Sequence, residues 1–543
     1  MQFFIKFSTW FDRTVLELGR EMRLSYLPPL MVYVAAGVAG LTGIVGTFFV
    51  KEYLGLSAEF LAALGFWVGI PWALKMPLGH LVDLIWRFKS ILVFVGAALI
   101  TASLLIMIGL LSHTEAMRAV MPAEAWFVIS ALLAPLGYVV QDVVADAMTV
   151  EAVPKYDRTG QVYDKETTRL MHTTMQTLGR VAIISGSIGV ALLNIYMFSG
   201  ATDLNEAVKL GIYTNIYQLA LAIPAISVMG VSLGGYLKWR EVRRLLQGGE
   251  TFTTAWNRVN TQPEKPAPNW WILGGSLIFV VFTLGVGLGN IPYNQEIIFV
   301  GSLSIILFLM SRLVKELNVD ARRTIVGTAI IIFIYRATPT PGPGSTWWMI
   351  DELGFDQQFL SVLSLVAGSL TLMGILVFRR FMAEKSIAYI VAFLTVASTI
   401  LALPIVGMFY GLHEWTAAAT GGIVDARFIA LADTALESPL GQIAMIPMLA
   451  WIANSAPPHL KATFFAVFAS FTNLALSASQ LGTKYMNQIF TISREIKDPA
   501  SGMITTPADY SELGMLLITV TLLVFFLPLI AIIVVRKIKL QSA

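Results

Sequence analysis

The stretch GYVVQDVVADAMTVE, residues Gly137–Glu151, decides how the rest of the chain can fold. It lies inside an apolar segment, about 125–153, that exceeds the ~20 residues a helix needs to cross a bilayer. Asp142 and Asp146 are four residues apart and therefore share one face of that helix. A carboxylate inside a bilayer costs at least ~2.5 kcal/mol, so each aspartate requires a cationic partner, a proton or a water-filled cavity.

The composition is that of a membrane protein. Hydrophobic residues make up 56% of the 543-residue chain and charged residues only 13%, against about 25% charged residues in a soluble domain. Many apolar runs of about 20 residues are continuous and do not alternate with a period of two, which favours an all-α polytopic membrane protein over a β-barrel. With no cysteine, the chain has no disulfide and no thiolate metal site. We predict no metal, no cofactor and no nucleic-acid partner.

Hydropathy predicts about fourteen membrane-spanning helices. They cover approximately residues 27–50, 58–84, 90–112, 125–153, 168–197, 211–236, 270–290, 294–313, 323–347, 359–380, 386–409, 426–454, 461–488 and 512–535. Lys and Arg gather in every second loop, whereas the alternate loops are poor in them. The positive-inside rule therefore places both termini in the cytoplasm, which requires an even number of spans.

The order of the spans suggests an internal duplication. A pair of acids four residues apart occurs in the fourth span (Asp142, Asp146) and again in the fourth of the last six spans (Asp433, Glu437). We therefore predict the two six-helix halves of a major-facilitator-type transporter, whose substrate binds near the midplane between the halves. The predicted parts are a cytoplasmic amphipathic lead-in (1–26), an N-terminal half (27–237), a cytoplasmic linker (238–269), an inserted helical hairpin at the periphery (270–322) and a C-terminal half (323–543).

Three charges of the N-terminal half lie at one depth. Counted from the cytoplasmic ends of their helices, Lys75, Asp142 and Arg180 are each roughly 15–18 Å inside. We predict an ion-pair network in which Asp142 and Asp146 couple protons and Lys75 and Arg180 contact an anionic substrate. Asp146, one turn nearer the cytoplasm, has no obvious cation at its own level and is the second candidate proton carrier. The alternative is that these charges are static pairs that hold helices together.

Two acids lie nearer the cytoplasmic surface. Asp83, just before Arg87, is expected to form a gating clasp with it between helices. Glu151 is expected to be solvated or paired with Lys155 or Arg158, and it has no predicted role in transport.

A second cluster lies in the ninth span. Tyr335 and Arg336 precede a stretch, 337–346, with three prolines and two glycines, which breaks a helix. Irregular backbone at membrane depth is tolerated only where it is buried in protein or lines a wet cavity, so Arg336 is a candidate substrate contact. Trp347 and Trp348 are expected to belong to the interfacial aromatic belt.

The paired acids of the C-terminal half receive separate roles. We predict that Glu437, nearer the midplane, couples protons, and that Asp433 contacts the substrate. Arg427 or Lys484, toward the outer surface, is the expected partner of Asp433.

Four motifs in order resemble the folate–biopterin transporter family of the major facilitator superfamily. They are PWxxKxPxG with Asp83 (71–83), QDxxxDAxxxE (141–151), RATP followed by ELGF (336–355) and DxxxExxLGQIAxxP (433–447). The resemblance implies a multi-pass transporter of the cell membrane (the inner membrane in a Gram-negative bacterium) that takes up folates or pterins with protons. Folate carboxylates would suit Lys75, Arg180 and Arg336, and the flat ring would suit Trp72 or Tyr335. The family's basic run after the second span is shortened to RFK (87–89), Arg336 replaces an aromatic residue, and the hairpin is additional.

Other functions remain open at this point. The same fold can carry a sugar or another metabolite with protons or sodium, in either direction, or act as an assembly factor or receptor that transports nothing. An enzyme is not expected, because the sequence has no Walker loop, HExxH or GxSxG motif and no Cys/His ligand set. The expected partners are a small-molecule substrate, protons or sodium, and the lipid bilayer, with the chain acting as a monomer.

Overall fold

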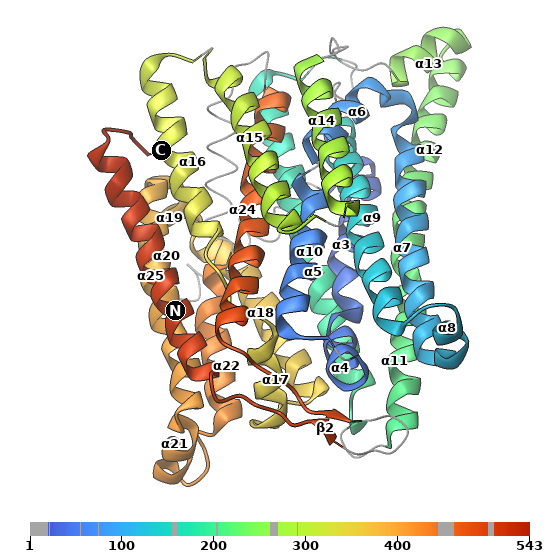
Figure 1. Ribbon diagram of the computed structural model, residues 1–543. Helices are drawn as coiled ribbons and strands as arrows, with labels where there is room; N and C mark the ends of the chain where they lie inside the picture. The colour runs from blue at the N-terminus through green and yellow to red at the C-terminus, as the bar shows by residue number, and fades with distance from the viewer. Residues whose placement is uncertain are drawn as a thin grey trace, which may run out of the picture.

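The computed structural model describes residues 20, 22–54, 56–73, 75–154, 161, 163–201, 205–260, 270–289, 291–315, 317–441, 443, 461–497 and 504–542. Almost all of the regular structure in these ranges is helical, and the long helices run up and down roughly side by side (Figure 1). The sheet found there is an antiparallel pair, β1 (Ile496–Lys497) and β2 (Ile504–Thr506). The predicted all-α class is therefore confirmed.

The N-terminal half begins with the 3-10 turn η2 (Leu24–Tyr26). It continues with α3 (Leu27–Val38), η3 (Ala39–Thr42), α4 (Gly43–Tyr53), α5 (Ala58–Ala73), α6 (Lys75–Leu84), η4 (Trp86–Phe88), α7 (Lys89–Ser112), α8 (Thr114–Val120), α9 (Ala123–Ala152), α10 (Lys165–Met197), α11 (Glu206–Ala220) and α12 (Ala222–Gln247). A short helix, α13 (Phe252–Asn260), follows. The hairpin consists of α14 (Trp270–Leu288) and α15 (Asn294–Val314).

The C-terminal half comprises α16 (Val319–Arg336), α17 (Pro343–Asp351), α18 (Gln357–Val377), α19 (Arg379–Glu384), α20 (Ile387–Phe409), α21 (Leu412–Thr420), α22 (Ala426–Glu437), η6 (Ser438–Leu440), α24 (Lys461–Ile489) and α25 (Leu513–Lys537). Several helices start at a side chain that caps them: Asp356 accepts a bond from the Phe359 amide, and Ser386 precedes α20 in the same way. These caps satisfy amides that the first helical turn leaves free.

Eleven helices in the described ranges are long and apolar enough to cross a membrane. Each overlaps one of the predicted spans. The other three predictions differ for local reasons: α16 and α17 are separated by a break, residues 444–460 lie outside the described part, and α24 is a long but more polar helix. The predicted total of about fourteen spans stays a prediction.

The predicted break in the ninth span is confirmed. α16 ends at Arg336, and the chain is irregular until Pro343 begins α17. The prediction that Trp347 and Trp348 lie in the interfacial belt is wrong, because only 1% and 5% of their surfaces are exposed. After the break, α17 packs in an apolar cluster with residues of α18, α20, α22 and α25, so both rings are covered by protein.

Two long contacts join the halves. α5 packs along α24, and α10 packs along α18. The hairpin lies beside the first of these contacts, where α15 packs on α24 and α14 packs on α6 (Figure 1). We call the end where α6, α12 and α25 finish the basic end, since the Lys- and Arg-rich loops lie there; the other is the opposite end. The basic end is the upper end in Figure 1.

The opening stretch is placed by a close helix crossing. α7 and α9 meet at Gly96 and Gly137, where a Cβ on either glycine would lie 2.6 Å from the carbonyl oxygen of the other. Only glycine permits this approach. Next to the crossing, Gln141 donates to the Val93 carbonyl at 3.1 Å and accepts from Ser227 at 2.9 Å, so it ties α9 to α7 and α12. These contacts hold α9 against α7 and α12 directly beside Asp142.

Candidate functional site

A charge network lies inside the N-terminal half. The ammonium group of Lys75, at the start of α6, lies 2.6 Å from Asp142 Oδ2 and 2.8 Å from Asp146 Oδ2 on α9. The two aspartates are four residues apart, about 6 Å along the helix, so a flexible lysine can lie between their carboxylates. The ion pair predicted between Lys75 and Asp142 is therefore present. The expectation that Asp146 has no cation at its level is wrong, because Lys75 reaches both acids.

Tyr33 completes this network, although sequence reasoning missed it. Its hydroxyl donates to Asp146 Oδ1 at 2.7 Å from α3, and only 5% of the tyrosine is exposed. The ring lies against Gly179 of α10, where a Cβ would be 2.8 Å from it. The available signal was a polar hydroxyl inside an apolar first span, but nothing in the sequence indicates which way it faces. Asp146 therefore accepts both an ammonium and a phenol hydrogen bond.

Arg180 lies beside the network. It follows Gly179 directly on α10 and is close enough to Asp142 for their charges to interact. Within the described ranges it makes no ion pair. Lys75, Asp142 and Asp146 together carry one net negative charge when all are ionised, and Arg180 would balance it. The predicted set is thus brought together, with Arg180 as the cation that remains available.

Trp72 lies where the two halves touch. Its backbone carbonyl accepts a bond from the Asn473 side-chain amide of α24 at 3.2 Å. It comes three residues before Lys75, so the network adjoins the contact between α5 and α24. The predicted stacking role of the Trp72 ring stays a prediction.

The predicted residues of the C-terminal half lie around the end of α16 and on α22. Tyr335 and Arg336 are half-buried at the end of α16, and Tyr335 is close enough to Glu437 for their charges to interact. Arg336 and Glu437 make no ion pair with the described residues, and Asp433 Oδ1 is buried there without a hydrogen-bond partner. Within the described part of the chain, one cation and two acids are therefore left without an ion pair.

The expected partners of Asp433 are wrong. Arg427 contacts Asp356 at 3.4 Å, and Lys484 contacts Glu296 of the hairpin at 3.0 Å. Arg427 lies two turns from Asp433 on the same helix, but it points to the loop before α18. Lys484 faces the hairpin, whose position the sequence did not reveal.

The basic end carries a separate ion-pair cluster. Glu151 contacts Lys89 at 2.7 Å and Lys238 at 3.0 Å, which joins α9 to α7 and α12. The expected partners Lys155 and Arg158 lie outside the described residues. Arg87 donates to Asn257 of α13 at 3.5 Å. The side chain of Asp83 lies outside the described part, so the Asp83–Arg87 clasp stays a prediction.

The opposite end is closed by contacts between the halves. Lys51, at the end of α4, forms an ion pair with Asp351, at the end of α17. Tyr510 also donates to Asp351, and burial together with this bond raises the pKa of Tyr510 well above its ordinary value, so it stays a donor. The Gln357 amide donates to the Tyr213 hydroxyl at 2.8 Å across the same junction.

Comparisons with known proteins agree with this architecture. A model of the BT1 family matches residues 250–541, more than half of the chain. The folate-biopterin transporter of Synechocystis sp. is 25% identical over 481 residues, which cover 87% of this chain and 77% of that protein. Folate transporter 2 of Plasmodium falciparum is 26% identical over 180 residues, 32% of this chain and 36% of that protein.

Solved structures share the fold. A POT family transporter in complex with 5-aminolevulinic acid superimposes with a TM-score of 0.55 at 12% identity, covering 95% of this chain and 96% of that one. The nucleoside transporter NupG gives a TM-score of 0.52 at 12% identity, covering 94% and 99%. These structures and the curated relatives are transporters rather than enzymes, and the many apolar helices make this chain a multi-pass protein of the cell membrane. The chain belongs to the BT1 family of folate–biopterin transporters.

Proposed function

We propose that this membrane transporter moves a small anionic organic solute, of folate or pterin type, and couples that movement to protons. The observation that carries the proposal is the Lys75 ammonium shared between Asp142 and Asp146 at membrane depth. The Lys75 ammonium is attracted by both carboxylates. Protonating one carboxylate removes one of these attractions, so the ammonium can move toward the other acid or toward a substrate anion. The names of the curated relatives support the substrate class.

The substrate would bind between the halves. Arg180 and Arg336 supply one cation from each half, and neither forms an ion pair within the described ranges. Two cations, one from each half, suit a solute with more than one carboxylate, because bonds between charged groups are the strongest hydrogen bonds. Trp72 and Tyr335 supply aromatic faces for a flat ring. Asp433 and Glu437 would recognise amino groups of the ring or take part in proton movement.

The positive-inside rule gives the orientation of this proposal. The basic end faces the cytoplasm, with both termini on that side. The Lys51–Asp351 contact would then close the outer side in the conformation described here. Alternating access requires that it break when the halves rock about the central site. The chain would do this as a monomer.

Uptake into proteoliposomes tests the coupling. Asp142→Asn and Asp146→Asn should each abolish accumulation of labelled folate driven by an inward proton gradient, while leaving downhill exchange measurable. Asp320→Asn, at the first turn of α16, is the matched control and should accumulate normally. Normal accumulation by both network variants would exclude proton coupling through this site.

The same vesicles separate the alternatives. Uptake that follows a sodium gradient and ignores the proton gradient would identify sodium as the coupling ion. If folates and pterins neither cross in either direction nor stabilise the purified protein, the substrate class is wrong. Stabilisation is expected because a ligand that binds only the folded state raises the unfolding temperature.

A further inference from the structure

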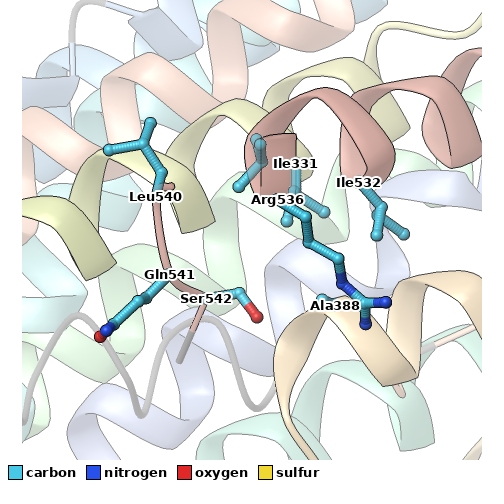
Figure 2. Close-up of a pocket in the computed structure, with 8 residues that line it drawn as sticks. Ile331, Ala388, Ile532, Arg536, Leu540, Gln541 and Ser542 are labelled. Atoms are coloured by element: carbon cyan, nitrogen blue, oxygen red, sulfur yellow. The ribbon is translucent and has the colours of Figure 1, made fainter. Parts of the chain in front are cut away.

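A hollow of about 330 Å³ lies at the basic end of the C-terminal half (Figure 2). It is bounded by α16, α20, α25 and the segment that follows α25. The lining residues are Ile331, Ala388, Ile532, Val535, Arg536, Leu540, Gln541 and Ser542. None belongs to the charge network or to the cluster around Arg336, so the hollow requires its own explanation.

The local sequence builds one wall of the hollow. Lys539 adopts a left-handed conformation, with a φ of 57°, and the Leu540 amide bonds back to the Val535 carbonyl at 3.0 Å. This reverses the chain at the end of α25, as in common helix C-caps. The reversed segment rests on α16, where Thr324 donates to the Gln541 side chain at 3.3 Å. Gly327 allows this contact, because a Cβ there would lie 2.2 Å from the Gln541 carbonyl.

The hollow is apolar on one side and cationic on the other. Ile331, Ile532 and Val535 form a buried floor, exposed by 1%, 6% and 1%. Arg536 is exposed and forms no ion pair with the part of the chain that the structure describes. Arg536 and Ser542 both line the hollow, and Figure 2 shows their side chains there. A ligand that fits must therefore join an anionic group to hydrocarbon.

The position of the hollow at the basic end of α25 indicates which kind of amphiphile it binds. The basic end of α25 is where the positive-inside rule places lipid headgroups, and pockets of this type between helices bind anionic headgroups. A volume of about 330 Å³ is at the low end of the ~300–1,000 Å³ typical of ligand pockets, which suits a headgroup and the first part of a chain.

We propose that this hollow is a binding site for an anionic phospholipid. Arg536 and Ser542 bind the phosphate, and the floor around Ile532 and Val535 receives the start of an acyl chain. The occupant would join α16, α20 and α25 at the basic end.

The test uses the full-length protein, purified in detergent, stripped of lipid and titrated with dioleoyl phosphatidylglycerol. Native mass spectrometry and thermal unfolding should show saturable binding and stabilisation. Arg536→Gln should weaken binding about tenfold, the contribution of one charge-assisted hydrogen bond. Lys537→Gln removes the same charge from the next residue, which does not line the hollow, and should change binding less than about twofold. Dioleoyl phosphatidylcholine should bind about tenfold more weakly than the anionic lipid.

Two further arms make the outcome decisive. Ala388→Leu fills the hollow without changing charge and should also abolish saturable binding, with the lipid-free unfolding temperature and elution volume reporting that the variant is folded. Equal losses in Arg536→Gln and Lys537→Gln, or normal binding by Ala388→Leu, would overturn the proposal. Stabilisation by glycerol phosphate equal to that by the lipid would show a site for free anions instead.

Discussion

At the scale of single residues, the site is a set of ion pairs and hydrogen bonds in which Lys75 and Asp146 each have more than one partner. Lys75 bonds to two carboxylates and Asp146 accepts from two donors, Lys75 and Tyr33. Each group therefore constrains the next, and removing one changes the surroundings of the others. Arg180 lies close enough to Asp142 for their charges to interact, but it forms no ion pair with the described residues. This arrangement explains why the network, rather than any one acid, is the candidate coupling unit.

Tyr33→Phe tests the bond that the sequence did not predict. Loss of the hydroxyl removes a hydrogen bond to a charged acceptor, so the variant should be less stable by about 1.5–3 kcal/mol. Thermal unfolding of the purified protein measures the change. Tyr196→Phe is the control, because 77% of that tyrosine is exposed and its loss should have an effect within about 0.5 kcal/mol. Equal stabilities of the two variants would contradict the bond between Tyr33 and Asp146.

At the scale of helices, backbone contact positions the carboxylates. α7 and α9 touch at Gly96 and Gly137, five residues before Asp142. Pro71 near the end of α5 and the break after Arg336 show that other site residues lie where helices are interrupted. Irregular backbone at membrane depth occurs only where it is buried in protein or lines a water-filled cavity, and polar side chains can also be accommodated at such places.

Gly137→Ala tests the crossing. Its Cβ would lie 2.6 Å from the Gly96 carbonyl oxygen and 2.7 Å from Ile100 Cγ1, so the helices must separate. Overpacking of this kind should cost about 1–3 kcal/mol. Gly189→Ala in α10 is the matched control, with no neighbour within 4 Å of its Cβ. It should stabilise the protein by up to ~1 kcal/mol, because alanine favours helix over glycine. Gly137→Ala should lower the unfolding temperature and Gly189→Ala should raise it. Shifts in the same direction would contradict the close packing of α7 on α9.

The hairpin is held by specific polar contacts. Glu296 of α15 accepts from Lys484 at 3.0 Å and from Tyr485 at 2.6 Å, both on α24, and Gln295 donates to the Ala63 carbonyl of α5 at 3.1 Å. The hairpin therefore contacts both α24 and α5, where the two halves meet.

Glu296→Ala should weaken the attachment of the hairpin. Lys484 is 16% exposed and Glu296 21% exposed, so the pair is shielded more than a surface pair. Removing Glu296 should lower stability by about 1–3 kcal/mol and increase hydrogen exchange in α14 and α15 before other helices. Glu250→Ala, which breaks the exposed pair with Arg258, should change stability by less than about 1 kcal/mol. Unchanged exchange in the hairpin would show that apolar packing alone holds it.

At the scale of the whole molecule, two halves meet along α5–α24 and α10–α18, and polar contacts close the opposite end. A transporter of this architecture must open that end in part of its cycle. The network around Lys75 belongs to the N-terminal half, whereas Arg336 and Glu437 belong to the other. Rocking of the halves would therefore change the distance between the two groups.

A cysteine pair at Lys51 and Asp351 tests this closure. The chain has no cysteine of its own, so Lys51→Cys combined with Asp351→Cys supplies the two thiols without background. A short bifunctional thiol reagent should join α4 to α17 and stop uptake, and a cleavable version should restore it when reduced. Each single variant, treated in the same way, should keep its uptake. Full uptake by the cross-linked protein would mean that this end does not open.

The amino-acid sequence was enough to predict the membrane class, the positions of most helices, the break after Arg336 and the acids within the apolar helices. These follow from local causes: the length of apolar runs, the missing amide of proline and the cost of charge in a bilayer. The motifs around Lys75, Asp142 and Glu437 also indicated the family that the comparisons confirm.

Which charged and polar groups meet depends on how helices from distant parts of the chain pack together. Glu151 binds Lys89 and Lys238, which are 62 and 87 residues away in the sequence. Tyr33 reaches Asp146, and Lys484 turns to Glu296 instead of Asp433. Such pairings depend on how each helix is rotated and on which helix packs beside it. Those features arise from many side-chain contacts between distant segments, which hydropathy and charge along one chain do not encode.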